Sequence, residues 1–588
     1  MEEKWVVYGK KADFYAIGEK FHIDPVIARV IRNRDIVGDE EINRYLHADY
    51  SMVHSPGLMY DMEKACSIMK KSLEEDEHIR IISDYDVDGV TSNYILLDGL
   101  KNLGAKVSFE IPDRILDGYG INERMVEDAY RDGVGTIITC DNGIAAFTAI
   151  ERAKALGMTV IVTDHHEVPY DMVDGKRVSR LVAADAVVDP KREECNYPFK
   201  GLCGAGVAYK FIRCLYDMMG VSWEDEERYI DILAIATMCD VMELVDENRV
   251  YVKKGLEIIP RSKNKGIRAL IDANELTGKK LSSYHLGFII GPCINATGRL
   301  ETAKRGLMLL ASEDEEECSR IAQEMVSINI ERKNMTNKGV DEGIMLVSES
   351  YMQDNVLVVT MPKLHESLAG LVAGRIREQY YKPTIVLTKT EGGMWKGSGR
   401  SIEGYHMFDA LNEVKDYLEK FGGHEMAAGL SLKEENIEGF RQKLNELENM
   451  SEDTLTRKIR LDAAMPISYV TFNLVEQLSL LEPFGKGNEK PQFAQADLKV
   501  KKAYYVGKEK RFVKYMLCDS NGKTMEAMDF NGEKFVENIK MWFSEEECDK
   551  MFNGLPNEVK LDVVYYPEMN EFNGRKQLQL KPEAYRKA

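Results

Sequence analysis

Short apolar runs alternate with amphipathic stretches between residues 56 and 190. The apolar runs are rich in β-branched residues and cover 79–82, 106–111, 136–140 and 159–163. The stretches between them space their apolar residues as a helix does and cover 91–103, 122–131 and 145–156. Strands that alternate with helices through short loops predict an α/β domain with a doubly wound parallel sheet. Ligands of such sheets bind at the carboxyl ends of the strands.

Three aspartates stand where the first apolar run ends. Asp84, Asp86 and Asp88 alternate with other residues, and an extended backbone would place all three on one face. Converging carboxylates repel one another unless protons or cations offset their charge, and hard divalent cations suit such oxygen ligands. A polar strand-to-helix loop would give the same pattern, so this run alone leaves both interpretations open. Gly89 follows and predicts a tight turn into the next helix.

Acidic and imidazole side chains also follow the next strands. Asp141 comes directly after the third apolar run, and Asp164, His165 and His166 come directly after the fourth. Three strand ends therefore bring typical metal ligands to one edge of one sheet. Asp240 ends a later apolar helical run and adds a fourth source of carboxylate. The set fits a two-cation site in which Asp141 bridges ions about 4 Å apart.

The rest of the chain divides into segments with different patterns. A charged stretch with helical spacing predicts a connecting helix, and short β-like runs without crossover helices predict a small barrel near the C-terminal end. We expect a partly helical lead-in at 1–55 with no assigned chemistry, a catalytic α/β domain at 56–311, the connecting helix at 312–348, a second α/β domain at 349–450 and the barrel at 451–588.

Composition narrows the class of protein. The chain has 588 residues, of which 44% are hydrophobic and 30% charged, so it is long enough for several ordinary globular domains. It contains no apolar run of about 18 residues and no secretion signal, and its ten cysteines form no Cys-x-x-Cys pair. We therefore expect a cytoplasmic protein without a membrane span, disulfide framework or zinc ribbon. A net charge of −20 disfavours nucleic acid unless a local basic patch or bound cations reverse the field.

The order of these motifs resembles the DHH phosphoesterase family. The four signature motifs of that family are matched by Asp84-Tyr85-Asp86-Val87-Asp88-Gly89, Asp141-Asn142-Gly143, Asp164-His165-His166 and the segment around Asp240. The segments 197–199, 204–208 and 291–299 narrow the likeness to the single-strand-specific 5′→3′ DNA exonucleases of the family, over roughly residues 50 to 585.

The resemblance implies a metal-dependent active site. It implies that two divalent cations, manganese or alternatively magnesium, are held by Asp84, Asp86, Asp88, Asp141, His165 and Asp240. It also implies that His166 faces the scissile phosphate, with Asp141 and Asp164 completing the catalytic set. A hydroxide activated by two cations needs no serine or cysteine nucleophile, and the sequence offers no such constellation.

The same resemblance implies a phosphate-binding set, which comprises Arg114, Arg299, Ser398, Arg400 and His424. Arg114 and Arg299 would hold DNA phosphates, although a surface ion pair is the alternative for either. The glycines beside Ser398 and Arg400 would let backbone amides approach an anion, and these two residues would grip the 5′ phosphate in a DHH-associated domain. His424 would line the cleft.

One position departs from the family pattern. The chain has His365-Glu366-Ser367-Leu368 where a glycine commonly follows His-x. The serine leaves open the local turn and any contact of His365 with the substrate.

The implied function is metal-dependent hydrolysis of single-stranded DNA from the 5′ end to 5′-mononucleotides, in DNA repair or recombination. The barrel, which resembles an OB fold, would bind single-stranded DNA, and a helicase and a single-strand-binding protein are suggested as partners of a monomer. Two alternatives are a phosphodiesterase acting on short oligonucleotides or cyclic dinucleotides, and a catalytically idle replication scaffold. The C-terminal barrel disfavours the first, and the complete set of ligand-type residues disfavours the second.

Overall fold

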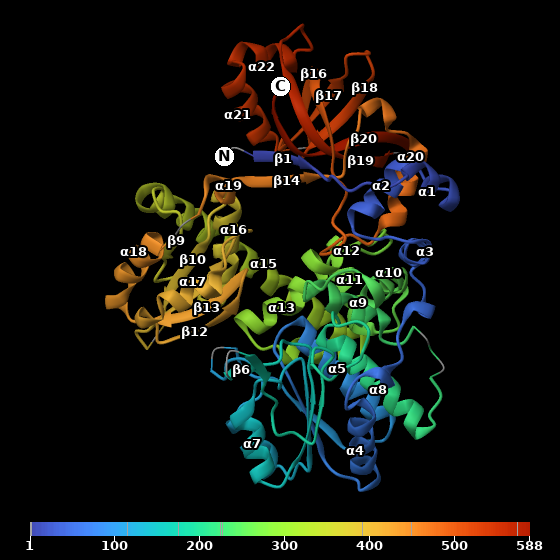
Figure 1. The fold of residues 1–588 in the computed structure, drawn as a ribbon, viewed down its shortest axis with the longest axis vertical. Coiled ribbons are helices and arrows are strands. Elements are labelled where there is room, and N and C mark those ends of the chain that lie inside the picture. The colour runs from blue at the N-terminus through green and yellow to red at the C-terminus, as the bar shows by residue number, and fades with distance from the viewer. Residues whose placement is uncertain are drawn as a thin grey trace. The chain divides into compact units, whose positions relative to one another are not determined.

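The structure is a computed structural model (Figure 1). It describes residues 3–114, 116–173, 176–223, 225, 227–390, 392–447, 450–507, 509–572 and 574–588. The chain divides into two compact units. Unit 1 contains residues 51–242 and 246–457, and unit 2 contains residues 3–50, 243–245 and 458–588. None of the described helices combines the length and the apolar character needed to cross a bilayer.

The first domain of unit 1 is built on the predicted parallel sheet. Its strand order is β3-β2-β4-β5-β8, and every pairing is parallel. The strands are β2 (Ile79–Ser83), β3 (Val107–Glu110), β4 (Thr136–Cys140), β5 (Thr159–Thr163) and β8 (Ala186–Val188). Figure 1 shows α7 (Phe147–Ala155) on one face of the sheet, and α4 (Met62–Glu74) and α8 (Gly204–Met219) on the other. The doubly wound fold class is therefore confirmed.

Helices complete this domain and continue out of it. In addition to α8, the helices α5 (Val87–Asn102), α9 (Ile230–Cys239) and α13 (Gly291–Leu300) lie beside the segments that carry the expected metal ligands. The others are α6 (Glu123–Arg131), α10 (Asp246–Ile258), α11 (Lys265–Ala273), α12 (Ser283–His285), the π-helical turn η4 (Leu286–Ile290) and α14 (Lys304–Ala311). The expected connecting helix is α15 (Glu315–Leu346), with 32 residues. A two-stranded hairpin, β6 (Tyr170–Val173) and β7 (Lys176–Ser179), stands apart from the main sheet.

The second domain of unit 1 has a mixed sheet with the order β12-β13-β11-β10-β9. Its strands are β9 (Leu357–Thr360), β10 (Thr384–Lys389), β11 (Trp395–Arg400), β12 (Lys420–His424) and β13 (Ala427–Leu432). Its helices are α16 (Ala369–Tyr380), α17 (Met407–Glu413) and α18 (Ile437–Leu447). The glycine-rich segment with Ser398 therefore lies in a central strand instead of a loop. Close packing explains the glycines, because a Cβ on Gly397 would come within 2.6 Å of the Leu387 side chain.

Unit 2 contains the C-terminal barrel. Strands β16, β17, β18, β20 and β19 pair in that order, and β19 pairs with β16 to close the ring. They are β16 (Phe493–Val506), β17 (Phe512–Cys518), β18 (Thr524–Asp529), β19 (Lys560–Phe572) and β20 (Arg575–Lys587). The short strand β15 (Ala463–Ala464) pairs with β16. Helices of this region are α20 (Phe472–Leu478), α21 (Gly532–Trp542) and α22 (Glu545–Phe552), whereas α19 (Glu452–Leu455) is the last helix of unit 1. The predicted barrel is confirmed.

The N-terminal segment belongs to unit 2. Strand β1 (Glu3–Val7) pairs with β14 (Arg457–Leu461). The helices of the segment are α1 (Phe14–Phe21), α2 (Pro25–Asn33) and α3 (Asp39–His47). The buried residues Ile27 and Ile31 of α2 share one hydrophobic core with barrel residues such as Phe493.

Candidate metal centre and substrate pocket

Four neighbouring strands of the parallel sheet end in register. Ser83 is aligned with Cys140, Cys140 with Thr163, and Thr163 with Val188. The next residue of every strand is an aspartate: Asp84, Asp141, Asp164 and Asp189. All four carboxylates are buried at the same sheet edge. The strand ends converge as expected from the sequence. Asp189 was not among the residues predicted to lie there.

The first motif converges through a turn and not through strand alternation. Strand β2 ends at Ser83, Asp86 is the N-cap of α5, and Asp88 lies in the first turn of that helix. The Asp86 side chain accepts a hydrogen bond from the Gly89 amide at 3.1 Å. A Cβ on Gly89 would lie 2.4 Å from the Asp84 carbonyl oxygen, so glycine allows α5 to start against the end of the strand.

The six expected metal ligands come together in overlapping groups. In each group the candidate ligand atoms lie within 4.8 Å of one another, and the groups are Asp84, Asp86 and Asp141; Asp88, His165 and Asp240; and Asp141, His165 and His166. His165 joins them, because its Nε2 lies 3.1 Å from Asp141, 3.5 Å from Asp88 and 3.6 Å from Asp240. Asp141 is common to two of the three groups.

The electrostatics of the cluster fit cation binding. Burial and then the charge of Asp88 raise the pKa of Asp240 to about 8 and hold the pKa of Asp141 well above its usual range. Burial also lowers the pKa of His165 to about 4, which keeps this ring neutral and able to bind a metal. Asp84 Oδ1 and His165 Nδ1 are buried and have no hydrogen-bond partner among the described residues. Divalent cations would offset the repulsion that these acids share.

The first turn of α8 holds one of the acids. The backbone amides of Gly204 and Ala205 donate to the Asp88 carboxylate at 2.6 and 2.8 Å. A Cβ on Gly204 would meet the Asp141 Cβ at 2.6 Å. This helix N-terminus therefore fixes two acids of the cluster at once and provides partial positive charge. In the sequence, residues 204–208 were noted only for their resemblance to the family. The run of small residues at the start of an apolar helix could have indicated a helix N-terminus packed closely against the acids.

His166 is oriented by Asp164. Its Nδ1 lies 2.8 Å from Asp164 Oδ1, and Asp164 Oδ2 accepts from the Ile144 amide at 2.9 Å. Burial lowers the pKa of His166, but the hydrogen bond and charge of Asp164 outweigh it and raise that pKa to about 9. The Tyr119 hydroxyl lies 3.2 Å from His166 Nε2. Without bound cations, His166 therefore carries a positive charge beside the metal ligands at neutral pH.

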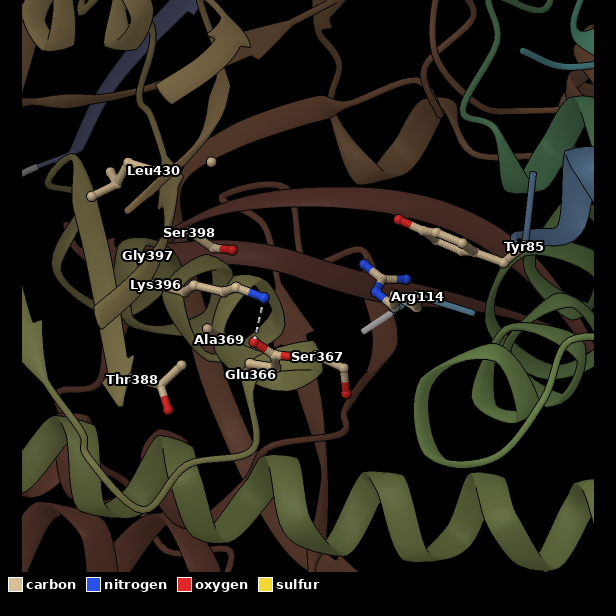
Figure 2. Close-up of a pocket in the computed structure, with 11 residues that line it drawn as sticks. Tyr85, Arg114, Glu366, Ser367, Ala369, Thr388, Lys396, Gly397, Ser398 and Leu430 are labelled. Carbon is tan, nitrogen blue, oxygen red and sulfur yellow. Dashed lines mark ion pairs between the residues drawn. The ribbon is translucent and has the colours of Figure 1, made fainter. Parts of the chain in front are cut away.

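A pocket lies between the two domains of unit 1 (Figure 2). Tyr85 and Arg114 contribute from the first domain, with the Arg114 guanidinium 4.7 Å from the centre of the Tyr85 ring. Ser398 and Lys396 of β11 contribute from the second domain, and Lys396 pairs with Glu366 at 2.9 Å. Figure 2 shows Arg114 and Tyr85 across the pocket from Ser398. Two of the expected phosphate-binding residues, Arg114 and Ser398, therefore line one pocket.

The expected arginines lack acidic partners within the part of the chain that the structure describes. No carboxylate of the described chain forms an ion pair with Arg114, Arg299 or Arg400, so the surface ion-pair alternative finds no support. Burial and then the charge of Arg114 lower the pKa of Arg299 to about 10. Burial, followed by the charge of Arg377, lowers the pKa of Arg400. Like charges held close together without carboxylates favour the binding of an anion.

His424 and Ser367 are two further positions singled out in the sequence. His424 is exposed at the end of β12, accepts a hydrogen bond from the Met426 amide and is not among the residues that line the pocket. Ser367 forms a 2.7 Å hydrogen bond with His365 Nδ1, and its carbonyl oxygen accepts from Arg299 at 2.6 Å. The Ser367 hydroxyl therefore holds the His365 ring at the start of a short 3-10 turn. The Ser367 carbonyl holds the Arg299 side chain beside the pocket.

Comparisons with known protein families match three segments of the chain. The DHH family N-terminal domain matches residues 78–237, the DHHA1 domain matches residues 353–449 and the RecJ OB domain matches residues 461–584. The single-stranded-DNA-specific exonuclease RecJ of Bacillus subtilis (strain 168) is 33% identical over 568 residues, covering 96% of this chain and 68% of that protein. The Escherichia coli (strain K12) protein of the same name is 30% identical over 579 residues, covering 95% of each.

A solved structure has the same fold. The crystal structure of RecJ from Thermus thermophilus in complex with Mn²⁺ has a TM-score of 0.81 and 24% sequence identity, covering 100% of this chain and 80% of that one. The Mg²⁺ complex from the same organism has a TM-score of 0.76. These two matches show that the fold is shared, and a divalent cation is bound to each of those proteins.

Proposed function

This chain belongs to the RecJ family of DHH phosphoesterases, and we propose that it hydrolyses single-stranded DNA from the 5′ end to 5′-mononucleotides. The curated relatives are named single-stranded-DNA-specific exonucleases, and they align with nearly the whole chain. The DHH and DHHA1 domains together with the OB barrel support a nuclease that acts on a polymer. DNA repair and recombination are the processes that such an activity would serve.

The observation that carries the proposal is the buried acidic cluster at the in-register strand ends. Asp84, Asp86, Asp88, Asp141, His165 and Asp240 would hold two divalent cations, Mn²⁺ in our proposal and Mg²⁺ as the alternative. When bound, such cations lower the pKa of a water and stabilise the charge that develops on the leaving oxygen. The unpartnered buried atoms Asp84 Oδ1 and His165 Nδ1 support this assignment.

The protein's own groups would position the phosphate. His166, held by Asp164, would face a nonbridging oxygen of the scissile phosphate. We assign catalytic roles to His166, Asp141 and Asp164. Arg114 and Arg299 would bind the backbone phosphates, because neither has an acidic partner in the described chain.

End specificity would come from the second domain. We propose that Ser398 and Arg400 bind the 5′-terminal phosphate and that His424 lies at the margin of the cleft. A pocket that accepts one terminal phosphate selects a free 5′ end. The barrel would bind single-stranded DNA. We further propose a monomer, with a helicase and a single-strand-binding protein as partners.

A degradation assay tests the proposal. Single-stranded DNA labelled at the 5′ or the 3′ end is incubated with Mn²⁺, beside blunt duplex DNA and a chelator control. Mononucleotides should appear first from the 5′ label, with none from the duplex or with chelator. The matched variants are Asp141→Asn, which should lose activity by about a thousandfold or more, and the exposed Asp171→Asn, which should retain it. Hydrolysis of dinucleotides only would favour a small-substrate phosphodiesterase, and no hydrolysis would favour a scaffold.

A further inference from the structure

Two exposed aromatic rings stack on the surface of unit 1, outside the pocket described above. Tyr284 and Phe288 are 60% and 65% exposed, and their ring centres lie 5.2 Å apart at an interplanar angle of 20°. We call these two residues the aromatic patch. Large apolar side chains that remain exposed as a stacked pair leave an outer ring face free to bind another flat group.

The aromatic patch is attached to the metal centre through α9. The π-helical turn η4 packs on the last turn of α9, where Cys239 Sγ lies 3.7 Å from the Leu286 carbonyl oxygen. The next residue, Asp240, is the C-cap of α9, and its carboxylate lies 3.6 Å from His165 Nε2. Phe288 therefore lies two residues after Leu286, whose carbonyl oxygen contacts Cys239. Cys239 directly precedes Asp240, an expected metal ligand. Single π-helical turns occur frequently at functional sites.

The same helical segment also reaches the phosphate pocket. From η4 the chain continues without a break into α13, where the Asn295 side chain accepts a hydrogen bond from the Val87 amide at 3.2 Å. Arg299, near the end of α13, binds the Ser367 carbonyl at the pocket. Phe288 and Arg299 are eleven residues apart, which is about 16 Å along a helix. A strand with the 3.4 Å spacing of a helical stack covers that length with roughly five nucleotides.

The surroundings of the aromatic patch suit a nucleic acid better than a protein. Burial and then the positive charge of the nearby Lys279 lower the pKa of His285. The Lys279 side chain is exposed. Two aromatic side chains bury at most about 500 Å², whereas a stable protein interface needs about 800 Å² on each partner. Base stacking on aromatic rings needs no such area and tolerates any sequence.

We propose that the aromatic patch stacks bases of the single strand that extends 3′ from the nucleotide at the metal centre, roughly five nucleotides beyond the phosphate that Arg299 would bind. This proposal rests on the proposed function. The patch would hold the strand during successive cleavage steps and would take no part in the chemistry. Short substrates would end before they reach it.

The test compares a long and a short substrate in the full-length protein. KM and kcat are measured with Mn²⁺ for a 5′-phosphorylated 20-nucleotide oligothymidylate and for the 5′-phosphorylated dinucleotide. The double variant Tyr284→Ala/Phe288→Ala should raise KM for the 20-mer about tenfold and leave both constants for the dinucleotide unchanged. The control variant Tyr130→Ala removes an aromatic ring that is 50% exposed on α6 and should change neither substrate. Phe288→Trp, which keeps a stacking surface, should retain the wild-type KM.

Several outcomes would overturn the inference. An unchanged KM for the 20-mer in the double variant would do so while leaving the proposed function intact. Equal losses on both substrates would show that the rings support the metal centre and not the strand. A change of oligomeric state with unchanged KM would identify a protein interface. A wild-type protein that degraded neither substrate would overturn the proposed function, and this inference with it.

Discussion

Asp141 has the most demanding conformation among the clustered acids. It is a non-glycine residue with a φ of 59°, in the left-handed region that costs roughly 1 kcal/mol or more. Its carbonyl accepts a hydrogen bond from the Tyr119 hydroxyl at 3.0 Å, and Gly204 packs against its Cβ. The turn directs the carboxylate toward His165 immediately after the strand ends. Strain held by surrounding contacts at this one residue agrees with its place in two of the three ligand groups.

The buried Asp189 gives a pH-dependent prediction. An unfolded carboxyl group has a pKa near 3.9. Burial, followed by the charge of Asp164, raises the pKa of Asp189 to about 8 in the folded protein. Between these pH values the folded state binds one more proton than the unfolded state, so this group lowers the free energy of unfolding as pH rises from about 4 to about 8. Asp189→Asn keeps the oxygen that accepts from the Lys191 amide and removes the titration.

The variant should therefore be more stable than wild type at pH 8.5, by roughly 2 to 5 kcal/mol, and about equally stable at pH 4.5. Urea unfolding of both proteins in chelator at the two pH values measures this difference. A stability difference that does not change with pH would contradict the raised pKa.

The positions of the acidic residues at the sheet edge were predictable from the sequence where a long apolar run precedes the acid. Asp84, Asp141 and Asp164 follow apolar runs of at least four residues, so their place at the sheet edge could be inferred from the sequence. Asp189 follows β8, which has only three residues, and Asp-Pro is also a common turn pair. The register that aligns it with the other three acids exists only in the folded sheet.

At the scale of elements, the N-terminus of α8 decides the geometry of the acids. Its amides bind Asp88, and the missing Cβ of Gly204 makes room for Asp141. These are backbone effects, which a search for ligand side chains cannot find. The glycines of β11 illustrate the same difficulty, because a Gly-x-Gly run predicts a loop while close packing against Leu387 places it in a strand.

Gly204→Ala should displace both acids. The added methyl group would overlap Asp141, so we expect Mn²⁺ affinity and kcat each to fall by tenfold or more, with a loss of stability of about 1 to 3 kcal/mol. Calorimetric titration with Mn²⁺ measures the metal affinity independently of turnover. The control is Gly374→Ala on α16, where a Cβ would meet nothing within 4 Å. It should leave metal binding unchanged. Equal Mn²⁺ affinity in Gly204→Ala and wild type would show that α8 does not position the ligands.

At the scale of the whole molecule, the two ends of the chain form one unit. Asn33 donates to the Asp462 carbonyl at 3.1 Å, and Arg34 forms a buried ion pair with the Asp462 carboxylate at 2.9 Å. The sequence predicted the barrel and the partly helical N-terminal segment separately. No local pattern links segments more than 400 residues apart, so their shared core could not be predicted.

Ile31→Ala tests this shared core. The side chain is 1% exposed within the core of unit 2, and its truncation should lower the stability of that unit by about 2 to 4 kcal/mol. Hydrogen exchange followed by mass spectrometry should show weaker protection in peptides from 493–506 and 560–571, and unchanged protection in 79–83 and 136–140. Loss of protection confined to residues 3–50 would contradict a common core.

We propose that the strand ends and α9 build a two-cation centre. Anomalous diffraction from crystals of the protein grown with Mn²⁺ tests it most directly. We expect two peaks about 4 Å apart, with Asp141 between them and with Asp84, Asp86, Asp88, His165 and Asp240 around them. A single peak, or peaks away from these side chains at full Mn²⁺ saturation, would contradict it.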